Sequence, residues 1–291
     1  ARPAPRRLSG SEEQRVLDLL NSERFADRAV PEIHSTLLDE GICLCSMRTM
    51  YRILKRHGGV RERRNQLRHP VYTKPELLAT GPNQVWSWDI TKVRGPSPGL
   101  FYHLYVMLDV YSRYVVGWVL AEYESGAQAK ALISLCHERQ GVGPNQLTVH
   151  SDRGKSMRSQ EVLGLLADLQ VRRSYSRPHV SNDNPYSEAQ FKTLKYHPTY
   201  PARFGSFEEA RRYFSELLEW YNTQHRHSGL AFMTPEDVHL GRAEEKRRQR
   251  QQVLDRAYAE HPERFVKGPP KAESVPQEVW INKPADLSSA G

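Results

Sequence analysis

Three acidic residues stand where carboxylates could do chemistry: Asp89, Asp152 and Glu188. Asp89 lies within VWSWDITKV, an apolar strand-like segment in which alternation places it on the face opposite the two tryptophans. Asp152 ends the strand-like segment LTVHSD, and Glu188 lies in the first turns of a predicted helix. An Asp within an apolar strand, such as Asp89, is unusual because strands disfavour Asp and burial of a lone charge is costly. Asp152 lies where ligands bind in α/β sheets, at the carboxyl end of a strand. An isolated acid is usually a surface charge, but these positions favour a site.

Three carboxylates at one edge of a sheet could hold divalent cations. Oxygen ligands that leave room for water suit Mg²⁺ or Mn²⁺ rather than zinc. Two such ions about 3.5–4 Å apart can stabilise both the attacking and the leaving oxygen of an in-line phosphoryl transfer. Such a trio could therefore hold two Mg²⁺ (or Mn²⁺) ions per active site and support a phosphoryl-transfer reaction.

The segments around these acids predict an α/β fold with a mixed sheet. Three strands come first and can pair as an antiparallel meander, and later strands alternate with helices that provide crossovers. The expected strands cover 85–93, 101–112, 113–121, 147–154 and 171–178, and the expected helices cover 126–140, 157–170, 184–197 and 206–222.

The N-terminal region predicts three short helices, over 11–21, 31–41 and 46–59, of which the third is basic. This pattern fits a helix-turn-helix DNA-binding unit, and a small helical interaction domain is the alternative. A basic linker that can track a phosphate backbone follows. The candidate DNA contacts are Arg48, Thr49, Arg52, Lys55 and Arg56 on the third helix and Arg61, Arg63 and Arg64 in the linker.

Composition agrees with an acidic partner. The chain has 291 residues, with 42 Lys and Arg against 34 Asp and Glu, for a net charge of +8. A mean hydropathy of −0.69, without a long apolar run, predicts no membrane span and no signal peptide. Three cysteines without paired spacing predict reduced thiols rather than a disulfide framework or a zinc site. A basic cluster around 246–250 is a further candidate for contacts with flanking DNA.

The spacing and surroundings of the acids resemble a known family. Thirty-five residues separate Asp152 from Glu188, within the words WSWDIT, LDVYSRYVVGW, HSDRG, SNDNPYSEAQFKTLKY and WYNTQHRHSGLAFMTPEDV. These resemble bacterial insertion-sequence transposases with a DDE, retroviral-integrase-like catalytic core, in particular the integrase-core subunit of the family made from two reading frames. The resemblance covers roughly residues 80–240.

The resemblance implies an RNase H-like core in which Asp89, Asp152 and Glu188 are the catalytic metal ligands. It also implies that Lys195, seven residues after Glu188, faces the DNA, and Lys192 lies near it. The expected domains are a helix-turn-helix domain with its basic linker over 1–68, a linker over 69–80, the catalytic core over 81–240 and a charged helical extension and tail over 241–291.

The implied activity is that of a DNA transposase that cleaves transposon ends and joins 3′-hydroxyl strands to DNA. Its expected partners are double-stranded DNA (terminal repeats and target), further copies of the chain in a dimer or larger synaptic complex, and a separately encoded protein from the N-terminal frame. The expected location is the cytoplasm, in association with the nucleoid. The alternatives are a structure-specific nuclease of the RNase H fold and a helix-turn-helix regulator with an inert core.

Four other residues have expected structural roles. Asp109, at the end of the second strand, is interpreted as structural rather than as a metal ligand. His150 is expected to form hydrogen bonds near Asp152. Tyr186 and Trp220 are expected to pack within the domain rather than to stack on bases.

Overall fold

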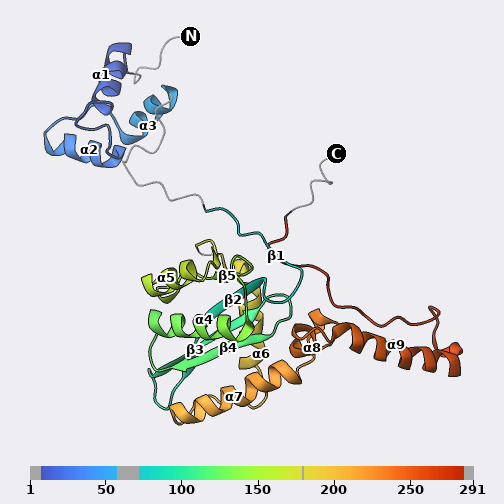
Figure 1. Ribbon diagram of the computed structural model, residues 1–291. Helices are drawn as coiled ribbons and strands as arrows, with labels where there is room; N and C mark the ends of the chain where they lie inside the picture. The colour runs from blue at the N-terminus through green and yellow to red at the C-terminus, as the bar shows by residue number, and fades with distance from the viewer. Residues whose placement is uncertain (1–7, 58–71, 179, 285–291) are drawn as a thin grey trace. The chain divides into compact units, whose positions relative to one another are not determined.

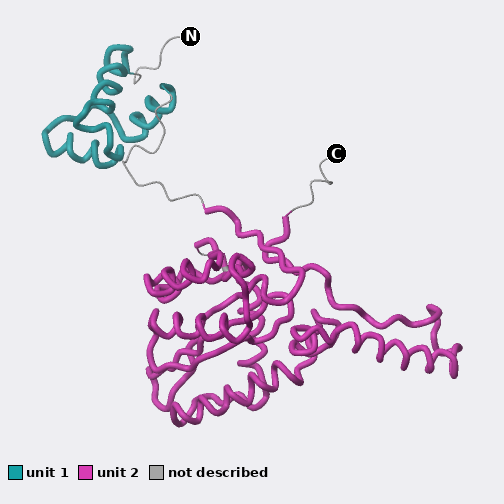
Figure 2. The backbone as a smooth tube through the Cα atoms, viewed as in Figure 1, with its two compact units in different colours: residues 1–71 teal, residues 72–291 magenta. Residues whose placement is uncertain are grey.

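The computed structural model describes residues 8–57, 72–178 and 180–284. It divides the chain into two compact units, residues 1–71 and residues 72–291 (Figure 2). The first unit contains α1 (Gly10–Leu20), α2 (Val30–Asp39) and α3 (Met47–Arg56). Ser46 caps α3 by accepting a hydrogen bond from the Thr49 backbone N–H, as its position before the third helix predicts. The three helices share one apolar core of Val16, Leu20, Phe25, Val30, Ile33, Leu37, Met50, Ile53 and Leu54.

The second unit is built on a five-stranded mixed sheet with the order β4-β3-β2-β5-β6. The first three strands of this sheet pair antiparallel, and β5 and β6 are parallel to β2, as the meander-and-crossover pattern predicts. This mixed sheet agrees with an RNase H-like core. The strands are β2 (Val85–Arg94), β3 (Phe101–Asp109), β4 (Val115–Ala121), β5 (Thr148–Ser151) and β6 (Arg172–Tyr175).

Helices cover both faces of this sheet (Figure 1). On one face, α4 and α5 pack on the tryptophan side of β2, where Trp86 and Trp88 are fully buried. On the other face, α6 and α7 pack through Phe191 and Phe214 against β3 and β4. Gly117 lets α4 approach β4, since a Cβ atom there would lie 2.2 Å from Cys136 Sγ. The helices are α4 (Gly126–Gln140), α5 (Gln160–Asp168), α6 (Pro185–Lys195) and α7 (Phe207–Thr223).

A second, two-stranded sheet corrects the expected linker over 69–80 and the expected tail. β1 (Leu77–Ala79) and β7 (Val279–Ile281) pair antiparallel, although about two hundred residues separate them. Val279 and Ile281 are buried against Val85 and Val110 at the end of the large sheet. Each strand has three residues, too few to show an alternating pattern in the sequence. Part of the expected tail therefore belongs to the compact unit.

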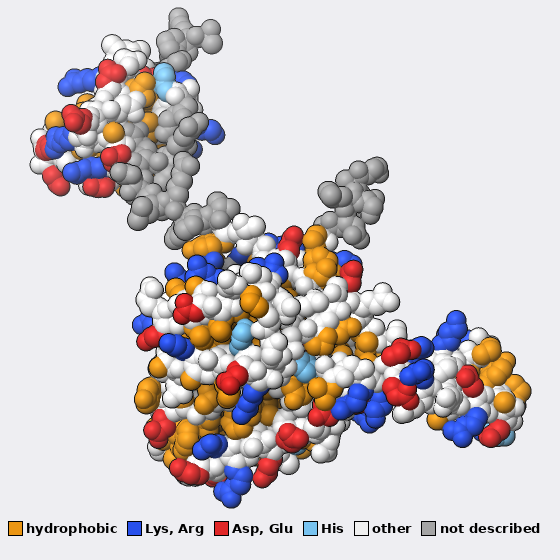
Figure 3. Space-filling model, viewed as in Figure 1, with side chains coloured by type: hydrophobic (Ala, Val, Ile, Leu, Met, Phe, Trp, Pro, Cys, Tyr) orange, Lys and Arg blue, Asp and Glu red, His pale blue; other side chains and the backbone are white. Residues whose placement is uncertain are grey.

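Beyond α8 (Pro235–His239), helix α9 (Ala243–Glu260) buries none of its side chains. Cations and anions are interspersed along it (Figure 3). Arg247 pairs with Glu244, Arg248 pairs with Glu245, and Arg250 donates to the carbonyl oxygens of residues 231 and 232. Acids one turn away and local carbonyls thus bind these three arginines, and their contact with flanking DNA stays a prediction. In the described ranges, no helix is long and apolar enough to cross a membrane.

Candidate active site

Asp89 lies on the polar side of β2, against helix α6. The neighbouring side chains on this side fasten the helix to the strand. Ser87 Oγ is 2.5 Å from Asn184 Oδ1 and 2.6 Å from Ser187 Oγ, all buried. At the other end of the helix, Lys195 Nζ donates to Thr91 Oγ1 at 2.5 Å. The alternation expected from the sequence therefore places Asp89 under the helix that carries Glu188.

Asp152 follows β5 directly, at the carboxyl end of that strand. Its Oδ1 accepts a hydrogen bond from Ser176 Oγ at 2.6 Å, and Ser176 follows the neighbouring strand β6. Asp152 and Glu188 line one cavity of about 490 Å³, together with Arg153, Ser176, Arg177, Pro178 and Val180. The two strand ends and the first turn of α6 thus meet at one pocket.

Glu188 is positioned by the loop that precedes α6. Asp183 in this loop is fully buried and accepts hydrogen bonds from the backbone N–H and the guanidinium of Arg177 at 2.9–3.0 Å. Asn282, from beyond β7, donates a further hydrogen bond to Asp183 at 2.8 Å. Burial alone would raise the pKa of Asp183, but these hydrogen bonds and the nearby cation outweigh burial and lower it to about 2. Asp183 is therefore an ionised anchor for the loop.

Electrostatics link the three predicted acids. Burial, helped by the negative charges of Asp152 and Glu188, raises the pKa of Asp89 to about 7, although the hydrogen bond from the Ile90 N–H and the Lys195 charge oppose this shift. Such a group favours neutralisation, by a proton or by a cation. Three carboxylates with room for water are the donor set that Mg²⁺ or Mn²⁺ prefers. The residues present therefore fit hard divalent cations, although within the described part of the chain no three acidic, histidine or cysteine side chains are gathered at metal-ligand distances.

Lys195 and Lys192 lie at the end of α6, and both are exposed. Partial burial lowers the pKa of Lys195, while the charge of Asp89 acts in the opposite direction. The seven-residue spacing from Glu188 predicts that both side chains lie on one side of the helix, and the structure has Lys195 donating to Thr91 of β2. Its role in DNA binding stays a prediction.

The predicted DNA contacts in the first unit have different environments. Arg48, Arg52 and Lys55 are exposed on α3, and Thr49 is half-buried beside its cap. Arg56 pairs with Glu13 of α1, and its contact with DNA stays a prediction. Helical spacing shows which face a side chain occupies but not the partner that an adjacent helix supplies. The linker candidates Arg61, Arg63 and Arg64 lie outside the described residues.

Several polar residues near the site are structural. Asp109 is fully buried and accepts hydrogen bonds from the Asn83 backbone and from Ser112, each at 2.7 Å, as its structural interpretation predicts. His150 Nε2 donates to the Asp183 carbonyl at 2.8 Å, and its Nδ1 lies 3.0 Å from Ser174 Oγ. Both ring nitrogens of His150 are thus engaged in hydrogen bonds.

Tyr186 and Trp220 pack within the domain, as expected. The Tyr186 hydroxyl donates to the Trp280 carbonyl at 2.7 Å, and its ring lies under Arg113 at 4.2 Å. Trp220 packs edge-on against His197, with 4.7 Å between ring centroids.

Sequence reasoning missed three residues at the site: Ser176, Arg177 and Asn282. The sequence points to the loop that they fix only through the turn-forming residues SNDN before α6. A serine, an arginine and an asparagine on separate segments carry no pattern that marks them as neighbours.

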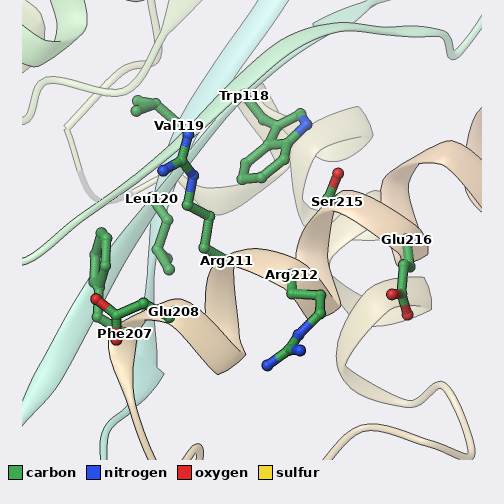
Figure 4. Close-up of a pocket in the computed structure, with 9 residues that line it drawn as sticks. All are labelled: Trp118, Val119, Leu120, Phe207, Glu208, Arg211, Arg212, Ser215 and Glu216. Atoms are coloured by element: carbon green, nitrogen blue, oxygen red, sulfur yellow. The ribbon is translucent and has the colours of Figure 1, made fainter.

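A second cavity, of about 610 Å³, lies between β4 and α7 (Figure 4). In Figure 4, Arg211 reaches toward the strand, whereas Arg212 points away from it. The lining side chains carry both signs of charge, and none of the predicted site residues is among them. The pocket with the acids is therefore the candidate active site.

Two family models match the chain, both described as "Integrase core domain", over residues 79–181 and 169–235. The transposase for insertion sequence element IS904 of Lactococcus lactis is 30% identical over 171 residues, which is 57% of this chain and 66% of that protein. Transposase InsF for insertion sequence IS3A of Escherichia coli is 31% identical over 162 residues, which is 55% of each. The chain thus spans between half and two thirds of the length of these relatives.

Similar solved structures include a simian T-cell lymphotropic virus intasome, with 20% identity and a TM-score of 0.46 over 71% of this chain and 70% of that one. They also include the HTLV-2 integrase catalytic core domain in complex with magnesium, with 17% identity and a TM-score of 0.41 over 55% of this chain and 97% of that one. The two family models show that the chain carries an integrase core domain over residues 79–235, and the two sequence relatives show that it is related to the insertion-sequence transposases.

Proposed function

We propose that the protein is a divalent-metal-dependent DNA transposase that cleaves transposon ends and joins the resulting 3′-hydroxyl strand to DNA. The integrase core domain and the transposase relatives support this reaction class. The observation that carries the proposal is that Asp152 and Glu188 line one pocket and lie near enough to Asp89 for their charges to help raise its pKa.

Asp89, Asp152 and Glu188 would hold two Mg²⁺ or Mn²⁺ ions, which when bound supply positive charge at the attacking and leaving oxygens of phosphoryl transfer. The protein's own groups would do the rest. Ser176 donates a hydrogen bond to Oδ1 of Asp152 and would thereby fix the orientation of this carboxylate at the pocket. Lys195, tied to Thr91 beside Asp89, would hold a backbone phosphate within reach of the acids.

The first unit would bind duplex DNA as a helix-turn-helix domain, with Arg48, Arg52 and Lys55 on the exposed side of α3. Joining two transposon ends needs at least two copies of the chain, so we propose a dimer or larger synaptic complex. The proposed partners also include terminal-repeat and target DNA and the separately encoded N-terminal-frame protein, and the proposed location is the cytoplasm at the nucleoid.

Labelled DNA that carries the terminal repeat of the encoding element, incubated with the protein and Mg²⁺, tests this proposal. A strand-joined product supports the transposase. Cleavage without joining would instead indicate a nuclease of the same fold, and a mobility shift without either product would indicate a DNA-binding regulator. The matched control omits the metal by adding EDTA, and it should abolish both products but leave DNA binding intact.

A further inference from the structure

The active-site pocket contains a guanidinium that the reaction described above does not use. Arg153 follows Asp152 directly and lines the same cavity. Its Nε donates to the Ser176 carbonyl oxygen at 2.9 Å. Its guanidinium carbon lies 4.3 Å from the ring centroid of Tyr72 and 5.6 Å from that of Tyr175. One hydrogen bond and two aromatic rings thus hold the guanidinium at the pocket.

Arg153 and Arg177, the two arginines of the pocket, have different electrostatic partners. Arg177 donates two guanidinium hydrogen bonds to the buried Asp183, which neutralises it. No described carboxylate lies within ion-pair distance of Arg153, and its Nε engages only an uncharged carbonyl. The terminal NH₂ groups of Arg153 therefore keep their donor capacity in a pocket where an anionic substrate would be processed.

We infer that Arg153 binds a backbone phosphate of the DNA strand that enters this pocket, a step that rests on the proposed function. A guanidinium fork suits the two oxygens of a phosphodiester, and holding the fork in advance reduces the rotamer entropy lost on binding. Tyr72 and Tyr175 would act as positioning residues for this fork. A purely structural arginine, which only joins the ends of β5 and β6 through Ser176, is the competing explanation.

DNA binding by the full chain separates these explanations without the metal-dependent reaction. The probe is a fluorescein-labelled 24-base-pair duplex of random sequence, in EDTA, with fluorescence anisotropy measured from 50 to 300 mM KCl. Loss of one phosphate contact lowers the slope of log K against log salt by about 0.9, which corresponds to roughly eightfold weaker binding at 0.1 M. We expect this change for Arg153→Ala. Arg153→Lys should keep most of the slope, because it keeps the charge.

Arg139→Ala is the matched control. Arg139 is exposed near the end of α4, which precedes β5, whereas Arg153 lies beyond the carboxyl end of that strand. This control should bind as the parent does. A second duplex that carries the terminal repeat shows which DNA the phosphate belongs to. An equal loss of affinity for Arg153→Ala on both duplexes indicates a sequence-independent contact, and a loss on the terminal-repeat duplex alone indicates a contact with the transposon end. Either result supports the inference.

Unchanged affinity and an unchanged salt slope for Arg153→Ala on both duplexes would overturn the inference. This holds even if urea unfolding shows that the variant is less stable, because a lower stability alone fits a purely structural arginine. If Arg153→Ala does not fold, Arg153→Gln decides, because glutamine keeps a polar side chain but removes the charge: a salt slope lower by about 0.9 supports the contact, and a parent-like slope overturns it. Failure of the proposed function looks different, because the parent itself would then bind neither duplex or join no strands with Mg²⁺.

Discussion

Replacement of Asp89 by Asn should stabilise the metal-free protein, and increasingly so as the pH rises. The folded protein holds the pKa of Asp89 at about 7, against a usual value of 3.8, so ionisation of this group disfavours folding between these two pH values. Linkage puts the cost of this ionisation at about 4 kcal/mol at pH 8 and about 2 kcal/mol at pH 5. The asparagine variant carries no such cost. The gap in unfolding free energy between variant and parent should therefore widen by about 2–3 kcal/mol from pH 5 to pH 8.

Urea unfolding in EDTA at pH 5, 6, 7 and 8, followed by tryptophan fluorescence, measures this gap. Asp168→Asn is the matched control, because Asp168 is an exposed aspartate at the end of α5, and its gap should stay within about 0.5 kcal/mol at all four pH values. Saturating Mg²⁺ should stabilise the parent and leave Asp89→Asn nearly unchanged. A gap that is constant with pH, or that narrows as the pH rises, would refute the electrostatic reasoning.

Three further substitutions test the framework of the site. Ser176→Ala removes the hydrogen bond to Asp152 and should raise the Mg²⁺ concentration for half-maximal strand joining by roughly tenfold, which a metal titration measures; an unchanged requirement would show that the serine does not orient the carboxylate. Asn282→Ala removes a donor to the buried Asp183 and should lower the unfolding free energy by about 1–2 kcal/mol in urea; no loss would mean that the segment after β7 does not stabilise the loop. Gly117→Ala places a methyl group against the Cys136 thiol of α4 and should lower the unfolding free energy by about 1–3 kcal/mol. A second substitution, Cys136→Ala, should restore most of this loss.

The sequence predicted the parts of the fold that local patterns determine. Alternation along VWSWDITKV placed Asp89 on the face opposite the tryptophans, and the structure has Trp86 and Trp88 packed under α4 and α5. The segment 126–140 matches α4 residue for residue, since Ser125 caps it and Gly141 ends it in the left-handed conformation. Strong local signals of this kind need no knowledge of distant residues.

The missed features depend on contacts between distant segments. Asn282 reaches Asp183 across ninety-nine residues, and β7 pairs with a strand near the start of the unit. Arg56 is bound by Glu13 from another helix, which the pattern of its own helix cannot reveal. Each contact is chosen by the tertiary fold, so residue type and spacing alone do not identify it.

Strand joining by single-residue variants tests the central claim most directly. The parent, Asp152→Asn and Glu188→Gln are incubated with the same labelled terminal-repeat DNA and Mg²⁺, after circular dichroism has shown that all three are folded. If the three acids form the reaction centre, the parent yields the joined product, and each variant loses it by at least a hundredfold while still binding the DNA (loss of one essential catalytic group costs about 10²-fold or more). Joining by Asp152→Asn at the parent's rate would contradict the account.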